Sequence, residues 1–123
     1  MRCDVITLFP EMVLAVLGES ILKRARACGL LDLQTHQLRD YAFDKHRMTD
    51  DAPYGGGGGM LLKPEPIFAA FEKVKEARGG EIRVIMPTPQ GRRFNQKMAE
   101  DFSKERRSLV FICGHYEGID ARV

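Results

Sequence analysis

The sequence contains no tryptophan and only three cysteines among its 123 residues, and no two of these cysteines form a C-x-x-C pair. An odd number of scattered cysteines excludes a disulfide scaffold and predicts a reducing, cytoplasmic compartment. Every hydrophobic run is far shorter than the roughly 18 residues that suggest a transmembrane helix, so no membrane span is expected. The three histidines are too far apart in the sequence to predict a metal site.

A large excess of charge of one sign is also missing. Lysine and arginine number 19 and aspartate and glutamate 17, and a net charge of +2 is too small to identify a nucleic-acid or membrane partner. Between positions 78 and 107, however, eight basic residues stand against four acidic ones. Such a stretch can contact phosphates, but it can equally be a solvated face, so composition leaves the partner open.

The hydrophobic content of 44% and the length are typical of one folded domain. Apolar patterning predicts strands at 4–9, 31–35, 82–86 and 109–113, and helices at 11–27, at 64–78 and after Asn95. Gly18 and Ser20 can divide the first helix into two. This order predicts an α/β fold with a mostly parallel sheet flanked by helices. Residues 117–123 resemble the first turns of a helix without a stop signal, so the chain is expected to continue past Val123.

A run of five glycines at 55–59 follows the acidic and aromatic segment 50–54. Ordering five glycines costs backbone entropy, so the run is expected where the chain must move or must closely approach a ligand or another backbone. A flexible linker is the alternative, although linkers are usually rich in serine. The spacing excludes two phosphate-binding motifs, because Lys63 does not follow a glycine and Met60 occupies the last glycine position of G-x-G-x-x-G.

Two further unusual segments, 86–93 and 113–120, each follow a predicted strand. Ligands of parallel sheets bind beyond the carboxyl ends of the strands. In the first segment the amide of Gln90 can read a base edge, and in the second the carboxylate of Glu117 suits a cationic ligand. A rigid turn and a helix cap are the simpler interpretations, but two such loops together favour a binding site.

Taken in order and spacing, the motifs at 8–12, 39–40, 46–47, 50–60, 89–91 and 113–123 resemble the bacterial tRNA (guanine-N1)-methyltransferases of the TrmD type. The resemblance implies a SPOUT-class α/β fold with a deep trefoil knot and S-adenosyl-L-methionine as the methyl donor. It further implies a homodimer that methylates N1 of the guanosine just 3′ of the tRNA anticodon.

The resemblance also implies roles for individual residues of this sequence. The cofactor would be bound by Pro89, Gln90, Gly91, Gly114 and Glu117. Catalysis would involve Glu117, with Asp50 in support, and the tRNA would be contacted by Arg47, Tyr54, Gly55, Gly56 and Gly59. The loop 54–59, together with Asp50, would close over the site from the partner subunit. No catalytic role is implied for His115.

In the family that these motifs resemble, the rest of the knot, the aspartate assigned as general base and a helical C-terminal domain follow the position of Val123. We therefore expect residues 1–123 to be the N-terminal part of the cofactor-binding domain, truncated before the knot is completed and inactive alone. Two alternatives remain open: a short non-catalytic RNA-binding or dimerisation module, and another SPOUT methyltransferase with a different RNA target, which the glycine motif disfavours.

Overall fold

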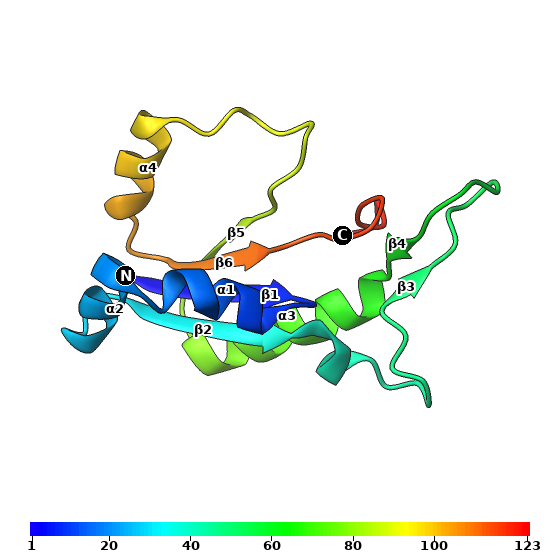
Figure 1. Cartoon of the computed structure of the whole chain (residues 1–123), viewed down its shortest axis with the longest axis horizontal. Helices are drawn as coiled ribbons and strands as arrows, with labels where there is room; N and C mark the ends of the chain where they lie inside the picture. Colours follow the sequence, from blue (N-terminus) through cyan, green and yellow to red (C-terminus); the bar gives the residue numbers. More distant parts are fainter.

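Four parallel strands form the main sheet of this computed structural model, which describes all of residues 1–123 (Figure 1). Along the chain the elements are β1 (Arg2–Thr7), α1 (Pro10–Leu17), α2 (Ser20–Ala27), β2 (Asp32–Gln37), the 3-10 helix η1 (Leu38–Tyr41), β3 (Asp50–Asp51), β4 (Leu61–Leu62), α3 (Pro64–Arg78), β5 (Ile82–Ile85), α4 (Gln96–Ser103) and β6 (Ser108–Ile112). The strand order is β2-β1-β6-β5, and β3 and β4 form a separate antiparallel hairpin. The expected mostly parallel α/β sheet is confirmed.

Side chains of β1 alternate between the two faces of the sheet, as the period of a strand requires. Ile6 belongs to a buried cluster with Ile67 of α3, whereas Val5 belongs to a second cluster against which Val13 of α1 packs. Helix α3 therefore covers one face of the sheet, and α1 and α2 lie over the other, on the viewer's side in Figure 1.

Local signals determine most helix boundaries. Pro64 starts α3 in the first-turn position where a proline is tolerated, and Gly79 ends it with a φ of 61°. Asn95 caps α4, its side chain accepting the N–H of Met98 at 3.0 Å. The predicted division of the first helix at Gly18 is confirmed. No helix is at once long enough and apolar enough to cross a membrane.

Most predicted strand ends differ from the observed ones by one or two residues, and the helix expected at 117–123 is wrong. Strand β1 ends at Thr7 rather than Phe9, because the Phe9 N–H donates to the Thr7 hydroxyl just before α1 begins. The segment 117–123 forms turns and no helix. Tyr116 and Gly118 have φ values of 58° and 140°, far from the roughly −63° that continues an α-helix. The Asp120 N–H donates to the Leu62 carbonyl of β4 instead.

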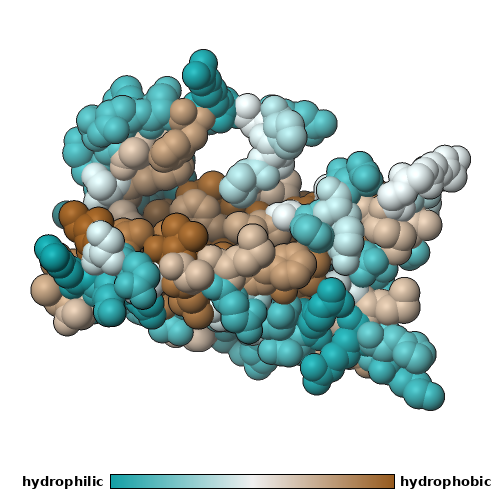
Figure 2. All heavy atoms as spheres, viewed as in Figure 1, coloured by the Kyte–Doolittle hydropathy of each residue, from teal (hydrophilic) through white to brown (hydrophobic).

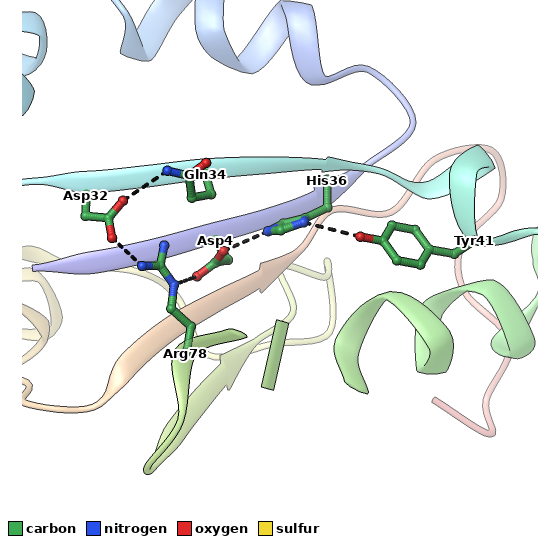
Figure 3. Close-up of polar contacts among 6 residues, drawn as sticks. All are labelled: Asp4, Asp32, Gln34, His36, Tyr41 and Arg78. Atoms are coloured by element: carbon green, nitrogen blue, oxygen red, sulfur yellow. Dashed lines mark hydrogen bonds and ion pairs between the residues drawn. The ribbon is translucent and has the colours of Figure 1, made fainter. Parts of the chain in front are cut away.

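A buried ion network joins the last turn of α3 to the sheet (Figure 3). The Asp4 carboxylate, only 2% exposed as a residue, accepts from Arg78 Nε at 2.6 Å, and a second nitrogen of the same guanidinium pairs with Asp32. Buried carboxylates need such a partner, because removing the charge from water costs several kcal/mol. The network thus anchors the end of α3 to both β1 and β2.

Polar side chains of β2 extend the same network toward η1 (Figure 3). His36 Nε2 lies 2.7 Å from the other Asp4 oxygen, and the Tyr41 hydroxyl lies 3.5 Å from His36 Nδ1. Burial favours a raised pKa for Asp4, but the hydrogen bonds from His36 and Arg78 outweigh it and hold this pKa below its ordinary value.

The face under α1 and α2 is less well covered than the face under α3. Neither helix contains a buried residue, and Met12, Val16 and Ile21 are 68%, 72% and 75% exposed. A hollow of about 530 Å³ on this side is lined entirely by hydrophobic residues of α1, α2 and the strands, and Figure 2 shows hydrophobic surface gathered there. We call this region the apolar face. A patch of this kind usually marks an interaction surface.

The ion network yields a stability prediction. Replacing Arg78 with alanine is expected to lower the free energy of unfolding by about 3 kcal/mol, because Asp4 is left buried without its main cation. The matched variant Lys75→Ala, on an exposed face of α3, should cost less than about 0.5 kcal/mol. Urea unfolding at pH 7 measures the stability of both variants. Equal losses of stability would show that Arg78 does not stabilise the buried Asp4 carboxylate.

The sign of the pH dependence follows from the lowered pKa of Asp4. The pKa of Asp4 is lower in the folded protein than in the unfolded chain, so ionised Asp4 stabilises the folded state at a pH above its pKa in the unfolded chain. This stabilisation is lost as the pH falls through the pKa of Asp4 in the folded protein. The gap in stability between wild type and Arg78→Ala should therefore narrow below about pH 4.

Candidate functional site

The loops that follow β5 and β6 enclose a cavity of about 580 Å³, which we call the first cavity. Parallel pairing of Ile85 with Phe111 brings the carboxyl ends of the two strands side by side, so their loops leave the sheet at the same edge. The lining residues are Met86, Pro87, Thr88, Pro89, Gln90, the segment 114–121 and Val123. The two unusual loops therefore line one cavity.

The loop after β5 is shaped by a tight turn. The Gly91 N–H donates to the Thr88 carbonyl at 3.1 Å, and a Cβ on Gly91 would lie 3.3 Å from the same oxygen. Pro89 and Gln90, in the middle of the turn, line the first cavity, while Gly91 lies behind them as the residue that closes the turn.

The loop after β6 contains an aromatic cluster. The ring of His115 packs edge-on against Phe9 at 4.9 Å and against Tyr116 at 4.5 Å between centroids. Tyr116 adopts a φ of 58°, a left-handed conformation that is unusual for a bulky residue and more often found at functional sites. These contacts hold the start of the loop, and Glu117 follows immediately.

Three backbone hydrogen bonds join this second loop to β4 of the same chain. The Glu117 N–H donates to Met60 at 3.1 Å, the Leu62 N–H to Gly118 at 3.0 Å, and the Asp120 N–H to Leu62 at 3.1 Å. We call this set of bonds the β4 seam. We call β3, β4 and the glycine run between them the glycine hairpin. Leu62 in its strand β4 is completely buried, and the Glu117 loop is hydrogen-bonded to this same strand.

A second cavity, of about 590 Å³, lies on the hairpin side of the seam. Tyr54 and Gly55 line it together with Asp120 and Arg122. Two nitrogens of the Arg122 guanidinium donate to the two Asp120 oxygens at 2.9 Å each, and the guanidinium lies 6.0 Å from the centre of the Tyr54 ring. Asp120 lines both cavities and so forms part of the wall between them.

The predicted site residues fall into three groups. Pro89, Gln90, Gly114 and Glu117 line the first cavity. Tyr54 and Gly55 line the second cavity, and Gly59 lies against Glu117.

Arg47, Asp50, Gly56 and Gly91 line neither cavity. Arg47 is exposed and pairs with Asp40 at 3.6 Å, and Asp50 is half-buried in β3, where it pairs with Leu62. Their proposed roles stay predictions. The structure holds no group of three or more His, Cys, Asp or Glu side chains placed to bind a metal ion.

The pair Asp120 and Arg122 was missed by sequence reasoning. Both lie in a motif that contributes to the family resemblance, but opposite charges two residues apart are too common to predict an ion pair. Only the backbone turn, in which the Arg122 N–H also donates to Asp120 at 2.9 Å, brings the two side chains together.

Four of the eight basic residues between positions 78 and 107 form ion pairs. Arg78 is buried in the ion network, Arg83 and Arg107 contact Glu105, and Lys97 contacts Asp101. The cations without an ion-pair partner are Arg92, Arg93, Lys104 and Arg106, all exposed. Arg92 and Arg93 follow directly after the loop of the first cavity, which makes them the cations of this stretch best placed to hold a ligand's phosphates there.

Comparisons with known proteins identify the family of this chain. The family model described as tRNA (Guanine-1)-methyltransferase TrmD matches residues 1–123. Over the whole chain the sequence is 54% identical to a tRNA (guanine-N(1)-)-methyltransferase of Dehalococcoides mccartyi and 52% identical to one of Anoxybacillus flavithermus, covering 49% and 50% of those proteins. The chain thus spans about half the length of the curated relatives it matches.

A solved structure is similar as well. The crystal structure of tRNA (m1G37) methyltransferase from Aquifex aeolicus superimposes with a TM-score of 0.88 at 38% sequence identity, covering 100% of this chain and 55% of that one.

The Asp120–Arg122 pair yields a prediction about titration. The hydrogen bonds from Arg122 hold the pKa of Asp120 at about 2. In the variant Arg122→Gln this pKa should rise toward the ordinary value of about 3.9, whereas Arg39→Gln, in η1, should leave it unchanged. Carboxyl-carbon NMR titration measures the shift, and an unchanged pKa in Arg122→Gln would show that the ion pair does not form.

Proposed function

Because this chain belongs to the TrmD family of tRNA (guanine-1)-methyltransferases, we propose that the full-length protein methylates N1 of the guanosine just 3′ of the anticodon in tRNA. The observation that carries the proposal is the first cavity. Its two loops contain two of the motifs that carry the family resemblance and lie where parallel sheets bind ligands.

The first cavity fits S-adenosyl-L-methionine as the methyl donor. Its volume of about 580 Å³ lies within the range of roughly 300–1,000 Å³ of small-molecule sites. The Gln90 amide and the loop backbone can recognise an adenine, and the missing side chain of Gly114 leaves room for a close ligand. The Glu117 carboxylate complements a cationic ligand. When bound, this cofactor supplies a methyl group carried on a positively charged sulfur.

The chain's own carboxylates have distinct parts in this chemistry. A neutral guanine N1 must give up its proton to a base during attack. Asp120 is a poor acceptor, because its pKa of about 2 keeps it ionised and bound to Arg122. Glu117 has no side-chain cation within ion-pair distance and is the carboxylate available to orient the cofactor and the target base. We assign the proton acceptor to the aspartate that the family resemblance places outside residues 1–123.

The hairpin side of the seam has the chemistry to contact RNA. Tyr54 is 87% exposed and carries the Arg122 guanidinium beside its ring, a combination on which an unpaired base can stack. A base in an anticodon loop is already largely unpaired, so turning it into a pocket has only a moderate cost. Arg92 and Arg93 would hold the neighbouring phosphates.

We propose further that residues 1–123 are the N-terminal part of a SPOUT-type cofactor-binding domain, with the trefoil knot formed by the full-length protein. The three cysteines are unpaired, which suits a cytoplasmic enzyme acting on tRNA. The apolar face supports a homodimer, because a second copy would bury the exposed Met12 and Val16. Asp50 and the loop 54–59 of the partner subunit would then complete each site.

Methyl transfer to tRNA tests the proposed function. The full-length protein should methylate a tRNA transcript in the presence of S-adenosyl-L-methionine and lose at least about 100-fold in rate with Glu117→Ala. A transcript with the guanosine 3′ of the anticodon replaced should not be methylated. Unchanged methylation of that transcript would refute the substrate assignment.

Sedimentation equilibrium tests the homodimer. The full-length protein should have the mass of two copies, and Val16→Lys should shift it to one copy by placing a charge in the apolar face. Phe43→Lys is the control, because Phe43 is 86% exposed and lies outside that face. A wild-type monomer, or a dimer that survives Val16→Lys, would contradict this interface.

A further inference from the structure

Gly59 differs from the other four glycines of the run in what surrounds it. A Cβ built on Gly59 would lie 2.3 Å from Glu117 Cγ and 2.9 Å from both Cδ and Oε1. Equivalent atoms on Gly55, Gly56, Gly57 and Gly58 would meet nothing within 4 Å. The Glu117 side chain therefore packs directly on the backbone of Gly59, in space that any other residue type would occupy.

The backbone on both sides of this contact is fixed. Met60, the next residue, accepts the Glu117 N–H, and the remaining bonds of the β4 seam hold the following residues of each segment. The two backbones cannot separate without breaking the seam. If residue 59 carried a side chain, the Glu117 side chain would have to rotate to another direction.

We propose that Gly59 is a positioning residue for Glu117. Its bare backbone is the surface against which the Glu117 side chain rests, and this contact couples the conformation of the glycine loop to the direction of the Glu117 carboxylate in the first cavity. The steric coupling stands on the structure alone, whereas its importance for methyl transfer rests on the proposed function.

A simpler explanation is that residue 59 must be glycine because its φ is +98°. The chain offers matched controls that separate the two explanations. Gly55 and Gly56 have φ values of 87° and 71° in open space, so alanine there introduces backbone strain without a clash. Gly58 has neither a positive φ nor a close neighbour.

A double-mutant cycle on the stability of the full-length protein provides the test. Gly59→Ala should lower the folding equilibrium constant by at least about fivefold more in the wild-type background than in Glu117→Ala, which removes the atoms that clash. The effect of Gly55→Ala should be the same in both backgrounds within about twofold. If Gly59→Ala alone fails to fold but the double variant folds, the coupling is supported.

The coupling is overturned if Gly59→Ala costs the same in both backgrounds, or if neither the single nor the double variant folds. A kinetic cycle on the full-length protein adds a readout that a purely structural role would not affect. Gly59→Ala should slow methyl transfer by a larger factor in the wild-type background than in Glu117→Ala, and equal losses in the two backgrounds would overturn the positioning role. If the wild-type protein does not methylate tRNA, the proposed function fails, and the stability cycle still decides the contact.

Discussion

The position of β6 between β1 and β5 is the constraint on which the rest of the structure depends. Its backbone pairs on both sides, and Ser108, Leu109 and Val110 are buried within the sheet. Because β5 and β6 run parallel and in register, their carboxyl ends must lie side by side. The cavity between the two loops follows directly from this pairing. The polar groups that line it lie in the loops and not in the strands.

Helix α3 connects the glycine hairpin to the sheet. It begins two residues after Leu62 and ends in the ion network at Arg78, while Ile67 and Val74 are buried against the sheet along its length. The base of the hairpin is thereby held by the core, by the ion network and by the β4 seam. Its tip has no such packing, since most of its glycines face open space. A fixed base under a loosely packed tip is consistent with the proposed contact of this loop with tRNA.

Local sequence signals predicted the local features well. The predicted bounds of helix α3 agree with the structure because Pro64 and Gly79 mark its ends. The prediction of a helix at 117–123 was wrong. The local sequence is compatible with a helix, but this segment forms backbone hydrogen bonds to β4 instead. The hairpin strands, the Asp4–Arg78 pair and the contact of Gly59 with Glu117 join segments that are distant in the sequence, as the separation of 74 residues between Asp4 and Arg78 illustrates. No local pattern encodes such pairs.

We propose above that the loops after β5 and β6 hold the methyl donor. A crystal structure of the full-length protein grown with S-adenosyl-L-methionine tests this proposal directly. We expect the cofactor in the first cavity, with its adenine beside Pro89 and Gln90 and its charged end toward Glu117. Cofactor density in the second cavity, beside Tyr54 and Lys63, or on the apolar face would refute the proposed site.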